Sequence, residues 1–125
     1  MDSSNYVDWF SRAKENLATA EHSFNNQHPK PLYSCFYLCQ MAIENYLKGL
    51  LVKNNTEPDK THDLILLLEK CERIDPLFTN YRREISFING FKTTAKYPNQ
   101  SEILVSDCEL AINIGKQIEK TVIRY

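Results

Sequence analysis

The stretch Leu32–Lys53 reads LYSCFYLCQMAIENYLKGLLVK and is apolar on more than one side when it is wound as an α-helix. A helix of that kind is either central to its own domain or shared with a second copy of the chain. One polar stripe interrupts it at every fourth residue, formed by Gln40, Glu44 and Lys48. Glu44 precedes Lys48 in the orientation that favours an ion pair. Such a stripe can line a ligand pocket or pair across a dimer interface, but it is more often the solvent edge, which we expect here.

A helix is also predicted before this stretch, over residues 4–24. Its apolar side chains recur at alternating steps of four and three, which is typical of one buried face. We expect Ser3 or Ser4 to cap it, and a polar segment with Pro29 and Pro31 to end it. The buried face consists of Tyr6, Phe10, Ala13, Leu17, Ala20 and Phe24.

Further helices are predicted after residue 53. One covers residues 61–75 with Thr61 as its N-cap, and the next covers 76–90 with Pro76 in its first turn and Gly90 at its end. A loop over 91–100 leads to a last helix over 102–123. No segment alternates with the period of a strand. The chain is therefore predicted to be all-α, an antiparallel up-and-down bundle of four to five helices in one domain over residues 1–125.

Composition narrows the class of protein. A chain of 125 residues can close one hydrophobic core, and its 42% hydrophobic and 25% charged residues are typical of globular domains. The formal net charge of -1 argues against coating of nucleic acid or membrane through bulk charge, although a local basic patch stays open. With only 3 glycines, an all-β domain and a glycine-rich phosphate loop are both disfavoured.

The cysteines and the N-terminal residues predict a cytoplasmic protein without membrane partners. The first ten residues, MDSSNYVDWF, lack the basic start and apolar run of a signal peptide, and the apolar runs elsewhere are too short to cross a bilayer. All four cysteines lie within apolar helical patterns, where reduced thiols pack as small core residues. They are Cys35, Cys39, Cys71 and Cys108.

Two segments carry candidate chemistry. In the quartet Thr61-His62-Asp63-Leu64, a histidine at a helix N-terminus could bind an anion or act on a proton. The alternative, which the residues alone favour, is that Thr61 and Asp63 cap the helix while His62 packs or hydrogen-bonds locally.

The second segment, residues 81–97, interleaves basic and aromatic side chains, as phosphate contact combined with base stacking requires. A solvated basic face over core aromatics explains the same pattern equally well. The basic residues are Arg82, Arg83, Lys92 and Lys96, and the aromatic ones are Tyr81, Phe87, Phe91 and Tyr97.

No other chemistry is predicted from the residues. His22, His28 and His62 are isolated and lack the spacing of metal ligands, and no local signature of a serine or cysteine nucleophile occurs. We therefore expect no metal, no cofactor and no catalytic residue.

Three motifs together resemble a known family. The run CQMAIENYLKGLL at 39–51 resembles the "aqQAxEkxlKALL" helix of HEPN domains (higher eukaryotes and prokaryotes nucleotide-binding). KTHDL at 60–64 is similar to the "KTHdL" element of that family, and AKYP at 95–98 is similar to its "aRYP" motif. Trp9 in the first helix also fits. The motifs occur in the family's order and spacing and cover most of the chain.

The resemblance implies a helical up-and-down bundle that forms a homodimer. It also implies association with a minimal nucleotidyltransferase protein as a toxin–antitoxin or defence pair. Many HEPN proteins are ribonucleases with an Arg-x(4–6)-His motif, from which this chain departs. No arginine stands at that spacing before His22, His28 or His62, and no histidine follows Arg82 and Arg83. We therefore expect no metal-independent ribonuclease activity.

The expected ligand-binding set combines the residues that match the family with the basic pair. Lys96 stands where the family motif has arginine, which keeps the charge but loses the bidentate fork. The leading hypothesis is a catalytically silent module that binds a nucleotide or nucleic acid and acts with a nucleotidyltransferase. The set is Lys48, His62, Asp63, Arg82, Arg83, Lys96 and Tyr97.

Two alternatives stay open. One is a noncanonical ribonuclease whose site is built from His62, Arg82 or Arg83, and Tyr97. The other is a dimerisation and interaction scaffold that uses the apolar stretch 32–53 as its interface.

Overall fold

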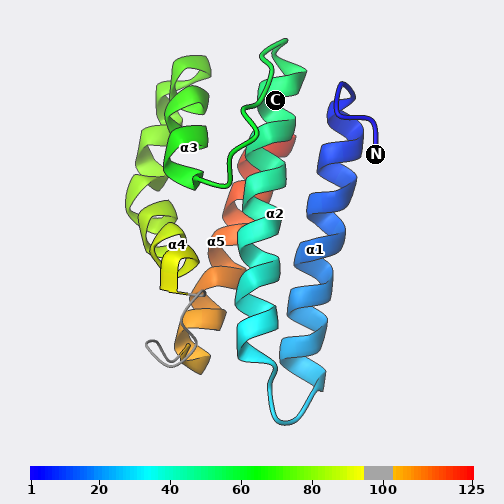
Figure 1. Ribbon diagram of the computed structural model, residues 1–125, viewed down its shortest axis with the longest axis vertical. Helices are drawn as coiled ribbons and strands as arrows, with labels where there is room; N and C mark the ends of the chain where they lie inside the picture. The colour runs from blue at the N-terminus through cyan, green and yellow to red at the C-terminus, as the bar shows by residue number, and fades with distance from the viewer. Residues whose placement is uncertain (95–102) are drawn as a thin grey trace.

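The computed structural model describes residues 1–94 and 103–125, with side chains at 92–94 not described. The described part is helical and contains no strand, which confirms the predicted all-α antiparallel bundle (Figure 1). The elements are α1 (Tyr6–Asn26), α2 (Leu32–Lys53), α3 (Leu64–Ile74), the 3-10 helix η1 (Pro76–Tyr81), α4 (Arg82–Thr94) and α5 (Val105–Ile123).

The helices pack around α2, which contacts α1, α3 and α5. Helices α1 and α2 form a hairpin, α3 and α4 form another, and α5 lies beside α2 (Figure 1). The segment between α2 and α3 runs back along α2, so that α3 lies beside the second half of that helix (Figure 1). This returning segment, residues 54–63, is called the return loop below.

Helix α2 is central to its own domain, because its apolar sides are covered within the chain. Leu47 and Leu50 are fully buried, and the Cys71 thiol of α3 donates to the Leu47 carbonyl. At the other end of α2, Tyr33 and Tyr37 are exposed. Of the two alternatives stated for this helix, a central place in its own domain is therefore confirmed for most of its length.

Tyrosine hydroxyl groups tie α5 to the rest of the bundle. The fully buried Tyr46 of α2 donates to Glu119, and Tyr81 of η1 contacts the Thr121 hydroxyl. After the end of α5, Tyr125 donates to Asp75, the residue that caps η1. These polar contacts supplement the apolar face of α5.

The helix starts differ from the predicted caps. The N-cap of α1 is Asn5, whose side chain accepts from the Val7 N–H at 3.0 Å, and not Ser3 or Ser4. The Ser4 hydroxyl instead donates to Asp2 at 2.6 Å. Helix α3 is capped by Asp63 and not by Thr61. In both helices the capping residue lies one to two positions later than predicted, next to the first helical residue.

Helix α4 extends beyond its predicted end at Gly90. No glycine in the described part adopts positive φ, and Gly90 continues the helix. The reason is the apolar contact that follows, since the Phe91 ring packs 4.5 Å from Phe36 and 5.2 Å from Phe87, centroid to centroid. The first residues of the predicted loop 91–100 are therefore helical, and residues from 95 onward lie outside the description.

The cysteines are free and buried, as predicted. Burial raises the pKa of the Cys71 thiol to about 12, so that this group stays protonated. None of the helices in the described part combines the length and apolar character that a bilayer crossing requires.

Candidate functional site

The polar stripe of α2 is buried, which makes the predicted solvent edge wrong. Gln40, Glu44 and Lys48 are only 7%, 4% and 6% exposed. Gln40 lies under α4, where its amide donates to the Ile88 carbonyl at 3.0 Å. The other two side chains lie beneath the return loop and the start of α1. Burial of charged groups is costly unless they are paired, so the pairing at this stripe is informative.

Glu44 joins two cationic or basic groups from different elements. Its carboxylate lies 3.1 Å from the Lys48 ammonium and 3.0 Å from Nδ1 of His62, eighteen positions away in the chain. The His62 side chain is 69% exposed although the side chains of its partners are buried. We call these three residues the Glu44 cluster.

The carboxylate orients the imidazole. A histidine whose Nδ1–H donates to a carboxylate presents Nε2 on its other side, as in second-shell arrangements around metals and in catalytic triads. For His62 that other side is in solvent. Nε2 can then accept a proton or, in the imidazolium form, donate to an anion.

Asp63 and its neighbours position His62 at the start of α3. The Asp63 side chain accepts from the N–H groups of Ile65 at 3.0 Å and Leu66 at 3.4 Å. Asn89 of α4 donates to the same carboxylate at 3.3 Å and accepts from the Leu64 N–H at 3.0 Å. Asp63 therefore makes the contacts of a structural cap.

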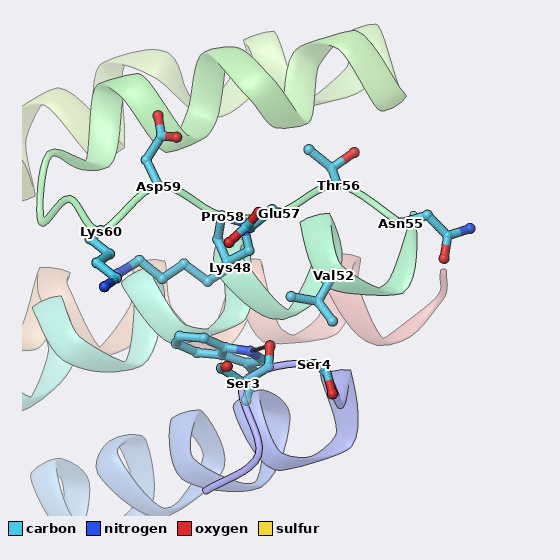
Figure 2. Close-up of a pocket in the computed structure, with 11 residues that line it drawn as sticks. Ser3, Ser4, Lys48, Val52, Asn55, Thr56, Glu57, Pro58, Asp59 and Lys60 are labelled. Carbon is cyan, nitrogen blue, oxygen red and sulfur yellow. Dashed lines mark hydrogen bonds between the residues drawn. The ribbon is translucent and has the colours of Figure 1, made fainter.

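A pocket of about 490 Å³ has Lys48, but neither Glu44 nor His62, among its lining residues. It is lined by Trp9, Ser3 and Ser4 at the start of the chain, by Lys48 and Val52 of α2, and by residues 55–60 of the return loop. Figure 2 shows Lys48 extending from α2 toward the Lys60 end of the loop. The ammonium lies 5.6 Å from the centroid of the Trp9 ring. We call this cavity the Trp9 pocket.

The basic pair lies away from the Glu44 cluster. Arg82 begins α4 and pairs with Glu72 at 2.8 Å and Glu69 at 3.8 Å, toward the far end of α3 from His62. Arg83 is exposed on the same turn of α4. Predicted site residues Lys96 and Tyr97 lie outside the described residues. The structure therefore brings together Lys48 and His62, with Asp63 adjacent, and does not bring Arg82 to them.

Of the aromatic residues predicted for base stacking, Tyr81, Phe87 and Phe91 pack against the core, and Tyr97 lies outside the described residues. Phe87 and Phe91 are partly buried and pack with Phe36. This outcome favours the second explanation of the 81–97 pattern, core aromatics with basic residues around them.

No group of three metal-ligating side chains comes together within residues 1–94 and 103–125. In the Glu44 cluster the carboxylate already pairs with the Lys48 ammonium at 3.1 Å. The arrangement suits proton transfer or anion contact at His62 better than cation binding.

The residue patterns missed several of these contacts. Trp9 was noted only as fitting a family motif, and the buried amide pair of Asn45 and Asn16, 3.0 Å apart, was not predicted. A signal for the burial of Glu44 and Lys48 did exist. The polar stripe belongs to a helix that is apolar on its other sides, and a polar loop follows this helix. That loop is long enough to fold back and cover the stripe.

Comparison with known proteins gives one result that covers almost the whole chain. The family model for the HEPN domain matches residues 6–125. The chain belongs to the HEPN domain family. No curated protein and no solved structure matches it. In this HEPN domain, two of the three motifs, at 39–51 and 60–64, meet at the Glu44 cluster, while the motif at 95–98 lies outside the described residues.

Proposed function

We propose that this HEPN domain binds a nucleotide or nucleic acid at the Glu44 cluster, with His62 as the residue that contacts phosphate. Membership of the family supports a nucleotide- or RNA-related module. The observation that carries the proposal is the exposed His62 imidazole held 3.0 Å from a buried carboxylate. An imidazole fixed in this way meets its ligand without first losing side-chain freedom.

The electrostatics of the cluster support contact with an anion. The Lys48 ammonium offsets the charge of the Glu44 carboxylate, and that carboxylate holds the exposed His62 imidazole in place. A phosphate at Nε2 would then complete an alternating series of charges. Because such contacts displace counterions, binding should weaken as salt increases.

The partners proposed for this protein are a second copy of the chain and a minimal nucleotidyltransferase, in a toxin–antitoxin-like pair. Support comes from the family motifs. Exposed apolar side chains, among them Tyr37 on α2 and Leu104, Val105 and Leu110 near the start of α5, offer surface for such association. Light scattering of the purified protein measures its molar mass and so tests for a second copy. Co-purification with a nucleotidyltransferase encoded beside it tests the second partner.

The test of the binding role compares two histidines. We expect His62→Gln to weaken binding of a labelled single-stranded RNA by about tenfold, on the order of 1.4 kcal/mol, in fluorescence anisotropy at low salt. His28→Gln is the matched control, because His28 is exposed and lies in the loop between α1 and α2. Equal affinities of the two variants would refute the role of His62.

A second candidate function is ribonuclease activity, and one observation favours it. A carboxylate-held imidazole with its other nitrogen in solvent is the arrangement of a general base, which could take the proton of a 2′-hydroxyl. The test incubates an RNA pool with the protein, with and without divalent ions. Cleavage that is lost in His62→Ala and reduced in Glu44→Gln would establish the enzyme. Intact RNA under all conditions would remove it.

A further inference from the structure

We propose that the Trp9 pocket binds a small organic anion with a flat apolar body and a single negative charge. This site is distinct from the nucleic-acid contact at His62, because Lys48 lines the pocket whereas Glu44 and His62 do not. Its volume of about 490 Å³ falls within the roughly 300–1,000 Å³ typical of small-molecule sites.

The walls of the pocket suit a flat apolar group. Trp9 lies on one side, held by its indole N–H, which donates to the Ser3 carbonyl at 3.0 Å. Val52 and Pro58 contribute aliphatic surface from α2 and the return loop (Figure 2). These three apolar side chains line one cavity, which is the usual composition of a ligand pocket.

The loop wall is fixed in place at its first turn. Asn55 adopts the left-handed conformation with φ of 58°, which asparagine tolerates better than most residues. Its N–H donates to the Val52 carbonyl at 3.0 Å, and the N–H of Thr56 donates to the Leu51 carbonyl at 2.8 Å. This end of the pocket is therefore formed before any ligand arrives.

The buried Lys48 indicates that the ligand carries a negatively charged group. A lysine ammonium has three N–H donors, and Glu44 accepts from one of them at 3.1 Å. The ammonium lines the pocket although the residue is nine-tenths buried, and a cationic group held in this way attracts an anion strongly where water is scarce. Lys60 lines the same cavity from the loop.

The number of charges on the ligand follows from the carboxylates nearby. Asp59 also lines the pocket, but it pairs with Lys70 of α3 at 2.7 Å. Glu44 offsets part of the charge of Lys48, and Glu57 adds a negative charge on the loop wall. This arrangement opposes a di- or triphosphate more than a carboxylate, so a single charge is favoured.

Trp9 itself reports on the site, since it is the only tryptophan in the chain. We expect phenylacetate to change its fluorescence in a saturable titration, and the neutral 2-phenylethanol to bind at least tenfold more weakly. Val52→Phe should abolish the phenylacetate response by filling the cavity. Circular dichroism verifies that each variant is folded.

Two lysines give the matched comparison. Lys60→Met should weaken phenylacetate binding several-fold, whereas Lys53→Met should leave it unchanged, because Lys53 lies over the Tyr6 ring and does not line the pocket. Both residues are remote enough from the core for the fold to persist.

Three results would overturn the proposal. The first is equal binding of phenylacetate and 2-phenylethanol, or no saturable response to either. The second is an equal effect of the two lysine variants. The third is a response to adenosine monophosphate without one to phenylacetate, which would make the pocket part of the nucleotide-binding function. Loss of RNA binding in His62→Gln bears on the proposed function alone, so failures of the two proposals are distinguishable.

Discussion

Lys48 and Glu44 place two opposite charges inside the most apolar helix of the molecule. Each has lost most of its hydration, and each depends on the other for compensation, since the two side chains are 8% and 5% exposed. A buried pair of this kind is weak evidence for stability but is costly to break.

Removal of one partner should therefore destabilise the fold. We expect Lys48→Met to lower the free energy of unfolding by about 3–5 kcal/mol, because the Glu44 carboxylate loses the ammonium beside it. Introducing Glu44→Gln into the Lys48→Met protein should recover much of the lost free energy of unfolding, because the buried carboxylate charge is then removed. Urea unfolding at neutral pH measures both, with Lys53→Met as the control, because Lys53 is a half-buried lysine on the same helix that lies over the Tyr6 ring. A double variant no more stable than Lys48→Met would contradict this explanation.

Asp63 is predicted to act on stability and not on ligand binding. Asp63→Ala should reduce the free energy of unfolding by about 1 kcal/mol through loss of the N-cap, while Asp63→Asn, which can still cap, should cost less. Both proteins should bind RNA with unchanged affinity once folded. Thermal unfolding and anisotropy give the two readouts, and a folded Asp63→Asn variant with weakened RNA binding would return this residue to the ligand site.

The residue pattern predicted the ion pair between Glu44 and Lys48 but not the side chains that surround it. The i,i+4 spacing and order of Glu44 and Lys48 indicate a contact within one helix, and that contact is present at 3.1 Å. Their burial and the approach of His62 depend on Trp9 and on the return loop. Helical periodicity carries no information about such packing between distant segments.

Among the elements, the hairpin of α1 and α2 depends on a glycine at their closest approach. A Cβ added at Gly49 would lie 2.6 Å from the Phe10 ring and 2.9 Å from Cβ of Trp9. Gly90 in α4 offers the contrast, because a Cβ there meets no heavy atom within 4 Å.

These two glycines give a matched prediction. We expect Gly49→Ala to destabilise the protein by about 1–3 kcal/mol through overpacking. Gly90→Ala should stabilise it by about 0.5–1 kcal/mol, because alanine restricts the unfolded chain and favours a helix. Melting temperatures of the two variants, compared with the wild type, should move in opposite directions. A shift of both in the same direction would contradict the packing assigned to Gly49.

The contact between Tyr125 and Asp75 ties the end of α5 to the start of η1 and should depend on pH. The hydrogen bond raises the pKa of Tyr125 to about 12 and lowers the pKa of Asp75 below its usual range. For a raised pKa, the stabilisation is complete below the unfolded value of about 10 and is lost as pH rises through about 12. For the lowered pKa of Asp75, it is lost as pH falls through the folded value.

Tyr125→Phe tests this window. We expect the variant to melt a few degrees below the wild type between about pH 5 and 9, because only the protonated phenol can donate to the carboxylate. The difference should disappear above about pH 12, where the wild type loses the same bond. Melting curves across the alkaline range give the measurement, and a difference that persists there would exclude the hydrogen bond as its cause.

The segments of the bundle could be predicted better than their ends. Apolar periodicity located the helical segments, because each buries a continuous face, but the helix predicted over 76–90 divides into the 3-10 helix η1 and α4, which starts only at Arg82. The ends follow side-chain details instead. Asn5 and Asp63 cap α1 and α3 in place of the predicted residues. Helix α4 continues beyond Gly90 because the Phe91 ring packs against Phe36.

At the scale of the whole molecule, the central position of α2 changes how an interface should be tested. Leu47 lies in the stretch 32–53 that the scaffold hypothesis uses as its interface, but it is fully buried inside the single chain. We expect Leu47→Lys to abolish the helical circular dichroism signal, because an unpaired charge would enter the core. Tyr37→Asp, at an exposed position of the same helix, is the variant that can report on association. A folded, monomeric Leu47→Lys protein would show that the scaffold hypothesis had placed the interface correctly.

The overall fold and the family could be predicted from the sequence because both depend on patterns that are local or ordered along the chain. The candidate site could be predicted only in part. His62 and Lys48 were identified, yet the carboxylate that joins them belongs to a stripe interpreted as solvent-exposed. The loop wall of the pocket comes from residues 55–60, of which only Lys60 belongs to a motif. Arg82 and Arg83 were grouped with them by charge alone, and α3 separates Arg82 from His62.

Lys48 belongs to two sites at once, because it pairs with the Glu44 carboxylate that holds His62 and it also lines the Trp9 pocket. An ammonium that shifts toward an anion in the Trp9 pocket leaves Glu44 with more of its charge directed at His62. If the two proposed sites are coupled in this way, thermodynamic linkage requires that a small anion and a nucleic acid alter each other's affinity by one common factor. A single side chain would thereby make the strength of RNA binding depend on the concentration of a metabolite that never touches the RNA.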